Sequence, residues 1–207
     1  VEASTGGAVG GENNYLAAGT LDIREDGPSV GYYLFPDIRN EMVASNTVDM
    51  EPERNRLVLR RFEVELDLQG IKTTGIPGHL LKFSTLATGL IEPQGELRVK
   101  FLQVLPDALV PFLQARIPAL GRLALIAKIK AVADHNGADL KSVEFEYPIQ
   151  ICKGCLLFVP AEKKCFPNKP ADNQVFPGNA CQLPQDVATT CCKPSAESPW
   201  KCYTQEE

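Results

Sequence analysis

The stretch that decides the fold is Val143-Glu-Phe-Glu-Tyr-Pro-Ile-Gln-Ile-Cys-Lys-Gly-Cys155. Hydrophobic residues alternate with polar ones as far as Ile151, which is typical of a β-strand with one buried face. The strand runs directly into the Cys-x-x-Cys pair Cys152 and Cys155. No cysteine precedes this stretch, and all seven cysteines of the chain lie from Cys152 onward. The sequence therefore predicts a β domain that is joined here to a disulfide-stapled tail.

Three regions follow from this division. Residues 1–14 contain four glycines and little that could be buried, which predicts a flexible leader. Residues 15–151 hold the hydrophobic strand patterns and predict the folded β domain. Residues 152–207 are rich in Pro, Asn, Lys, Gln and Cys and cannot build a core alone. We expect this tail to be held by disulfides and packed on the β domain.

The β domain shows roughly seven or eight short strand patterns separated by turn signals, as in a sandwich fold. In the clearest strand, Leu57–Leu68, the apolar side of the alternation switches between Leu59 and Phe62. We therefore predict a β-bulge at Arg60-Arg61, because one extra residue restores the inward face. The fold class predicted is all-β, an antiparallel two-layer β-sandwich of Ig-like or jelly-roll-like type.

A β-hairpin is predicted from residues 122–133 and 140–151, because Asn136-Gly137 between them tolerates positive φ. We expect Pro148 near a sheet edge, since it lacks an N–H. Strands are also expected at 80–90 and 96–105, with a short helical insertion at 106–118 in which Asp107 caps the helix. The inward faces of the second hairpin arm and of the strand at 96–105 are expected to be Val143, Phe145, Tyr147, Ile149 and Ile151, and Leu97, Val99 and Phe101.

Charge and hydropathy exclude two classes of protein. Residues 1–151 carry 15 Lys and Arg and 20 Asp and Glu, and residues 152–207 carry 6 and 6, which together give the net charge of −5. No basic stripe exists, so we expect no nucleic-acid partner. No apolar run reaches the roughly 18 residues of a membrane-spanning helix. The first residue is Val1, which favours a processed N-terminus.

The spacing of the cysteines favours structural disulfides over the alternatives. A zinc site wants a second Cys-x-x-Cys or a later Cys/His pair, and the tail has neither. A thioredoxin-like redox pair would start a helix, whereas Cys152 and Cys155 follow a strand. Covalent haem needs a histidine where Leu156 stands. The candidate bridge cysteines are Cys152, Cys155, Cys165, Cys181, Cys191 and Cys192.

Seven cysteines leave one unpaired, and we expect it to be Cys202, near the end of the chain. Cys191 and Cys192 are adjacent and should reach two different partners, because their Cα atoms are closer than the usual disulfide span. We expect Cys152 and Cys155 each to join a cysteine further down the tail rather than each other. Disulfides imply an oxidising compartment, so an extracellular or bacterial cell-envelope location is expected.

The tail resembles a known group of proteins in the pieces Ile-Cys-Lys-Gly-Cys-Leu at 151–156, Cys-Gln-Leu-Pro-Gln-Asp at 181–186, and Cys191-Cys192. These pieces are similar to cysteine-rich surface or lipoprotein-type proteins of myxobacteria and their relatives, best over residues 143–192. Upstream, Tyr-Tyr-Leu-Phe-Pro and Arg-Phe-Glu-Val-Glu-Leu are loosely similar too. Cys202 departs from the six-cysteine pattern of that group. The resemblance implies a secreted envelope location and no particular chemistry.

Catalytic groups are scarce in this sequence. The only histidines, His79 and His135, fall in predicted loops, so no nucleophilic triad is expected. The rows Glu63, Glu65, Asp67 and Glu144, Glu146 offer carboxylate pairs for glycosidase chemistry, but alternation already explains them as a solvated face. Asp134, Asn136 and Asp139 form a weak calcium candidate that a plain hairpin turn explains equally well.

These observations predict a non-catalytic extracellular or cell-surface protein with no cofactor. It would bind or assemble with other proteins, and self-association through edge strands or the N-terminal segment could build a surface filament or sheath. The alternative is a secreted domain that binds a carbohydrate or a metal ligand, with Trp200 and tyrosines stacking on sugars.

Overall fold

The computed structural model describes residues 2–4, 17–25, 29–45, 53–118, 121–158, 185–186, 189–192, 195, 197 and 201–204. For residues 2–4, 158, 189–190 and 201–204 only the backbone is described. The structure is mostly β, with 53% strand and 9% helix, which confirms the predicted class at this level.

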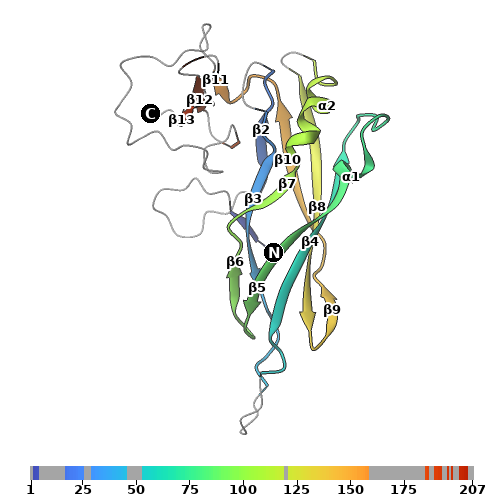
Figure 1. Cartoon of the computed structure of the whole chain (residues 1–207), viewed down its shortest axis with the longest axis vertical. Coiled ribbons are helices and arrows are strands. Elements are labelled where there is room, and N and C mark those ends of the chain that lie inside the picture. The colour runs from blue at the N-terminus through green and yellow to red at the C-terminus, as the bar shows by residue number, and fades with distance from the viewer. Residues whose placement is uncertain are drawn as a thin grey trace.

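The strands carry the labels of Figure 1. They are β1 (Glu2–Ser4), β2 (Gly19–Asp22), β3 (Tyr32–Arg39), β4 (Leu57–Leu68), β5 (Lys82–Ile91), β6 (Glu96–Arg98), β7 (Leu102–Leu105), β8 (Arg122–His135), β9 (Ala138–Lys141), β10 (Phe145–Cys152), β11 (Leu157–Phe158), β12 (Thr189–Cys192) and β13 (Lys201–Thr204). The helices are α1 (Gly78–Leu81), a 3₁₀ turn (Asp107–Leu109) and α2 (Val110–Gln114).

The largest sheet has the order β2-β10-β8-β4-β5, with β9 pairing to β8 beyond the end of β10. All of its pairs are antiparallel except β2–β10, which is parallel. The prediction of a purely antiparallel fold is therefore wrong. Sequence alternation shows which face of a strand is buried but carries no information about the direction of its neighbour.

A second sheet contains β1, β3 and β6, and β7 also pairs with β3. Together the two sheets form a curled half-barrel whose inner faces share one hydrophobic core (Figure 1). A Cβ on Gly89 of β5 would lie 2.3 Å from a side-chain carbon of Leu97 in β6. The two sheets thus come into close contact at β5 and β6 without pairing there.

The predicted bulge in β4 is confirmed, and it explains part of the curl. From Leu59 to Arg61 the chain advances two residues while the β8 partner advances one, from Ala133 to Val132. Over the same step β5 advances three residues, from Leu86 to Gly89. Over this step β8 therefore advances one residue, β4 two and β5 three, so each strand further from β8 has one more residue than its neighbour. Such bulges bend the strands and increase the local twist.

The predicted hairpin is confirmed at its turn, where Asn136 and Gly137 have φ values of 54° and 85°. Its second arm is divided, because β9 and β10 pair with β8 in registers that differ by one residue. This irregularity turns Val143 outward, where it is 82% exposed, so its predicted inward position is wrong. Pro148 stands one residue before β2 begins to pair with β10, which agrees with the edge position expected.

The strand expected at 96–105 is broken into β6 and β7, which pair with two ends of β3. Pro36 in the middle of β3 has no N–H, so a continuous partner strand would lose a hydrogen bond there. The break turns Phe101 outward, 54% exposed, so its predicted inward position is wrong. The helical insertion is confirmed, but Asp107 does not cap it: its Oδ1 accepts hydrogen bonds from the Gly31 N–H and the Gln103 side chain instead.

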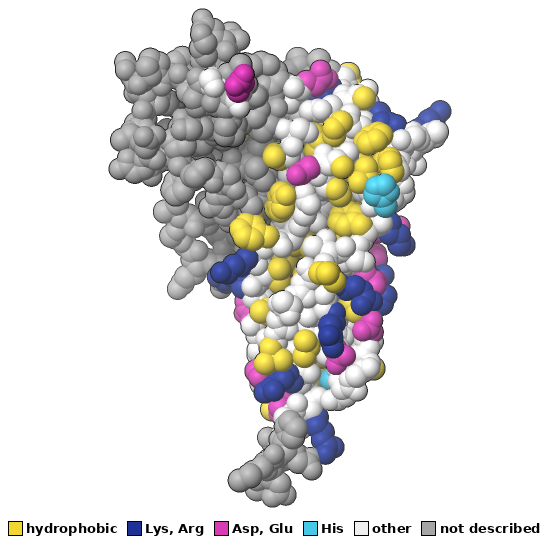
Figure 2. Space-filling view, viewed as in Figure 1, with side chains coloured by type: hydrophobic (Ala, Val, Ile, Leu, Met, Phe, Trp, Pro, Cys, Tyr) yellow, Lys and Arg dark blue, Asp and Glu magenta, His cyan; other side chains and the backbone are white. Residues whose placement is uncertain are grey.

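Charged side chains of both signs lie in mixed rows on part of the outside of the half-barrel (Figure 2). Figure 2 shows Lys, Arg, Asp and Glu side chains mingled over the lower part of the face it presents, with neither sign gathered into a patch. Cross-strand ion pairs account for this mixture on the outer face of the large sheet, including Arg61–Asp139, Lys141–Glu63 and Lys82–Glu65. Such exposed pairs stabilise a fold only modestly.

Candidate functional site

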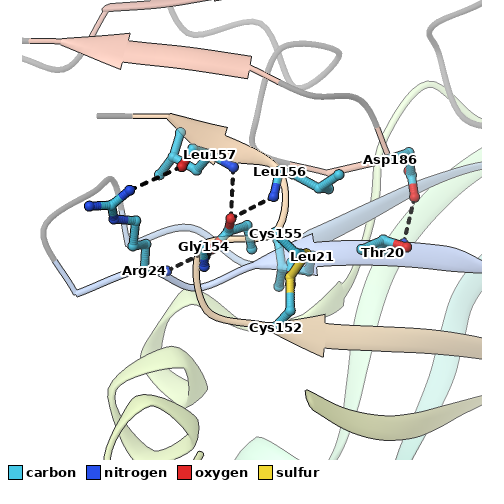
Figure 3. Close-up of a disulfide and its surroundings, with 10 residues drawn as sticks. Thr20, Leu21, Arg24, Cys152, Gly154, Cys155, Leu156, Leu157 and Asp186 are labelled. Carbon is cyan, nitrogen blue, oxygen red and sulfur yellow. Dashed lines mark hydrogen bonds between the residues drawn. A yellow bond between two sulfur atoms is a disulfide. The ribbon is translucent and has the colours of Figure 1, made fainter. Parts of the chain in front are cut away.

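Asp22 lies at the centre of the junction between the β domain and the tail. Strand β2 ends at this residue, and its side chain is only 1% exposed. Its Oδ1 accepts hydrogen bonds from the backbone N–H groups of Arg24 and Gly154, at 3.1 and 2.8 Å. Its Oδ2 accepts from the N–H groups of Leu156 and Leu157, at 2.8 and 2.7 Å (Figure 3). One buried carboxylate thus fixes the turn that leads from β10 into the tail.

Cys152 and Cys155 form a disulfide with each other inside this turn. Our expectation that each would pair further down the tail is therefore wrong. Gly154 has a φ of 76°, which lets the chain reverse within the four-residue loop. The two Cα atoms lie 6.0 Å apart, inside the usual span of a disulfide.

The chemistry open to this disulfide is limited by its surroundings. Cys155 is exposed, whereas Cys152 is 1% exposed. A thiol attacking Cys155 would leave a thiolate on Cys152, buried beside the carboxylate of Asp22, and both burial and a neighbouring negative charge disfavour a thiolate. The ligand atoms of these three residues lie within 4.8 Å of one another. The bonded sulfurs are not thiolate ligands, however, and the carboxylate already accepts four N–H groups, so the arrangement fits a structural clamp better than a metal centre.

Gln185 forms a second anchor of the tail. Its Oε1 accepts a hydrogen bond from the Tyr33 N–H at 3.1 Å, and its Nε2 donates to the Tyr33 carbonyl at 3.0 Å. Its backbone forms an isolated bridge with Leu21 of β2. A single tail residue therefore stands between β2 and β3 and joins the large sheet to the second sheet.

Asp186 completes this anchor through buried tyrosines. Tyr32 donates its hydroxyl hydrogen to Asp186 Oδ2 at 2.7 Å, and Tyr147 lies 3.3 Å from the Tyr32 oxygen. The Thr20 N–H donates to Asp186 Oδ1 at 2.7 Å. Burial raises the pKa of Asp186 above its ordinary value, and burial raises the pKa of Tyr147 to about 12. Tyr32, which is fully buried, also has a raised pKa, first through burial and then through the charge of Asp186.

The weak calcium candidate does not form a free ligand set. Asp134 and Asp139 stand opposite each other on β8 and β9. Each is held by one arginine of the bulge, Arg60 at 3.2 Å from Asp134 and Arg61 at 3.0 Å from Asp139. Asn136 donates to a backbone carbonyl. The ion pairs and the turn account for all three side chains.

The carboxylates considered for glycosidase chemistry form ion pairs with lysines. The hydrogen bond from Lys141 lowers the pKa of Glu63, and that from Lys82 lowers the pKa of Glu65. A glycosidase acid needs a raised pKa, so both shifts have the wrong direction for that role. Asp67 pairs with Lys128, and Glu144 pairs with Lys130.

The other predicted residues are scattered or lie outside the described part of the chain. His79 is exposed in α1, and His135 is half-buried at the end of β8. Cys191 and Cys192 are buried and both disulfide-bonded. Outside the described residues lie Cys165, Cys181, Trp200 and the side chain of Cys202, together with the pairing expected for them.

Sequence reasoning missed Asp22, Tyr32, Gln185 and Asp186. Asp22 gives one usable signal, because a charged residue between Leu21 and Ile23 interrupts an apolar run. Gln185 gives none, since a lone glutamine in a polar tail is ordinary.

One edge of β3 forms a further candidate surface. The N–H of Val99 donates to the Pro36 carbonyl at 2.9 Å, and the N–H of Asn40 donates to the Gly95 carbonyl at 3.0 Å. The even-numbered residues at this end of β3 therefore direct their backbone groups toward β6. The odd-numbered residues face the opposite edge, which Gln185 occupies at Tyr33 and β1 occupies along residues 35–37.

An apolar groove continues this edge beyond β1. It lies between the end of β3 and β9, with the inner faces of β4 and β8 as its floor. Its lining includes Ile38, Met42, Leu59, Ala131, Ala133 and Leu140. Arg39, the next odd-numbered residue of β3 after Asp37, also lines this groove.

No helix among the described residues has both the length and the apolar character to cross a membrane. Comparison with protein-family models, with curated protein sequences and with solved structures found no match to this chain.

Proposed function

We propose that this chain is a non-catalytic extracellular or cell-surface β module that acts in binding and assembly, including self-assembly into a surface filament or sheath. We further propose that the two sheets of the curled half-barrel correspond to the two layers of a β-sandwich of the Ig-like or jelly-roll-like kind. The observation that carries the assembly proposal is the completed edge of β3. Two segments distant in sequence, β1 and Gln185, add to that edge instead of a neighbouring strand of the domain.

Strand addition is a common way for proteins to recognise extended segments, because main-chain hydrogen bonds supply affinity. An edge that is completed by short pieces of the same chain can also accept pieces of another chain. The charged outer face favours this mode over a broad apolar interface, since its carboxylates are matched by lysines and arginines.

The proposed location outside the cytoplasm is supported by the disulfide at Cys152–Cys155 and by the bonded Cys191 and Cys192. The resemblance to envelope proteins supports the same location. A lipoprotein-like attachment to the envelope is part of this proposal.

The assembly state tests the proposal. We expect the oxidised full chain to form oligomers or fibres whose mass rises with concentration, measured by light scattering and by electron microscopy. A monomer at every concentration, with and without reductant, would show that the chain does not assemble on itself.

A second measurement tests whether copies of the chain are also joined by an intermolecular disulfide through Cys202, the cysteine expected to be unpaired within the chain. Electrophoresis without reductant should then show dimers that disappear on reduction and are lost in Cys202→Ser. Oligomers that persist in Cys202→Ser would assign assembly to non-covalent contacts alone.

A further inference from the structure

We propose that β1 is exchanged between copies: the N-terminal strand of one chain adds to the edge of β3 in a second copy, in place of that copy's own β1. This inference rests on the proposed function in assembly, and it names the acceptor, the donor and the register.

The acceptor is defined by the backbone of β3. In the antiparallel register, Glu2 stands opposite Asp37, Ala3 opposite Pro36 and Ser4 opposite Phe35. Because Pro36 directs its backbone groups toward β6, Ala3–Pro36 is the non-hydrogen-bonded pair, and Glu2 and Ser4 make the main-chain bonds. The next residue of this edge beyond Asp37 is Arg39, which lines the groove.

The donor is short, and its described contact is the pairing with β3. Strand β1 spans three residues, and none of them is a large apolar residue. Pairing over three residues forms few main-chain hydrogen bonds, and the same strand of another copy would form the same ones, so the exchange is nearly neutral in free energy.

The connection between β1 and β2 is long enough for exchange. Residues 5–16 separate Ser4 from the first described residue before β2. Twelve residues of extended chain span up to about 40 Å, which exceeds the diameter of a small domain. Exchange in one direction from copy to copy gives a heterologous contact, which generates rings or open filaments.

Cysteine trapping in the full chain tests the exchange. One variant carries Ala3→Cys and an affinity tag, and a second, untagged variant carries Pro36→Cys. A non-hydrogen-bonded antiparallel pair places two Cα atoms about 4.5 Å apart, which suits a disulfide. The two variants are mixed, oxidised gently and digested without reduction, and the linked peptides are identified by mass spectrometry. Thr88→Cys, exposed on β5, replaces Pro36→Cys in the control mixture.

We expect a disulfide between the cysteines introduced at positions 3 and 36 to join tagged and untagged chains. Its yield should be at least about tenfold above the Thr88→Cys control, because docking raises the effective concentration of the two sulfurs. A link equal to that control would overturn the exchange, as would a link confined to one molecule in the double variant Ala3→Cys/Pro36→Cys at every concentration. If the chain assembles without this link, the proposed function stands and the inference about β1 fails.

Two proline variants provide a test that leaves the core untouched. Ser4→Pro removes an N–H that bonds to β3, whereas Ala3→Pro removes an N–H that faces away from it. Ser4→Pro should raise the concentration needed for assembly several-fold, and Ala3→Pro should leave it unchanged. Equal effects of the two variants would show that assembly does not use this register.

Discussion

At the scale of single residues, two aspartates, the buried Asp22 and the half-buried Asp186, attach the tail to the β domain. Asp22 is satisfied by four backbone N–H groups and holds the turn after β10. Asp186 is satisfied by Tyr32 and by the Thr20 N–H, and it holds the tail against β2. The two carboxylates act differently. Asp22 organises a turn of the backbone, whereas Asp186 accepts hydrogen bonds from the buried Tyr32 hydroxyl and from the N–H of Thr20 in β2.

Replacing Asp22 by Asn should destabilise the chain by about 3 kcal/mol, because hydrogen bonds to a buried charged group are worth about 1.5–3 kcal/mol each and the new NH₂ would face N–H donors. Urea denaturation measures this loss. Glu25→Gln is the control, because Glu25 pairs with Lys153 while 70% exposed and should matter little. Equal effects of the two substitutions would contradict the role of Asp22.

The raised pKa of Asp186 predicts a pH dependence of stability. Between its ordinary value of 3.8 and its raised value, the folded chain binds more protons than the unfolded chain. The contribution of this carboxyl is therefore largest at low pH and is lost as the pH rises through the raised value. The difference in Tm between the natural chain and Asp186→Asn should fall as the pH is raised toward neutral. A difference that grows with pH would reverse the assignment.

At the scale of elements, the sequence predicted what depends on local pattern. Leu57–Leu68, the bulge at Arg60-Arg61 and the Asn136-Gly137 turn all follow from alternation or from φ preferences, and the structure confirms them. The errors at Val143 and Phe101 arise where a register change depends on a partner strand. The parallel β2–β10 pair and the Gln185 anchor could not be predicted, since no local pattern encodes contacts across more than 120 residues.

The bulge gives a prediction for the curl of the sheet. Deleting Arg60 keeps the inward alternation of Leu59 and Phe62 but removes the extra residue, so β4 would no longer match both β5 and β8. We expect a loss of about 2–3 kcal/mol in unfolding experiments, as for other disruptions of backbone geometry. Arg60→Ala retains the extra residue and should cost less than about 1 kcal/mol. Similar losses would show that the side chain, not the bulge, matters.

At the scale of the whole molecule, the described part of the tail is attached to the half-barrel at two points. The turn around Asp22 fixes the start of the tail against β2, and Gln185 fixes a second point of the tail between β2 and β3. Gly154 of the turn and Asp186, the neighbour of Gln185, lie beside Leu21 and Thr20 of β2 (Figure 3).

We expect the Cys152–Cys155 disulfide to contribute less to the stability of the turn than the hydrogen bonds to Asp22 do. A loop of four residues gains about 2 kcal/mol from its closure in the chain-entropy estimate. The double variant Cys152→Ser/Cys155→Ser should therefore lose about 2 kcal/mol, with an unchanged denaturant slope and unchanged assembly. Complete unfolding of the double variant would show that the disulfide, and not Asp22, secures the turn.

The contacts that Gln185 and Asp186 make with β2 and β3 can form only late in the synthesis and folding of the chain. Thr20 and Asp186 are 166 positions apart, so on the ribosome β2 and β3 emerge long before the residues that join them. Throughout that interval Tyr33 of β3 lacks the partner that Gln185 provides, and contacts of such sequence separation form slowly. Refolding should accordingly show an early phase for the half-barrel and a late phase in which Tyr32 becomes buried. During that late phase the backbone of Tyr33 at the edge of β3 has no partner, and exposed strand edges of this kind favour aggregation.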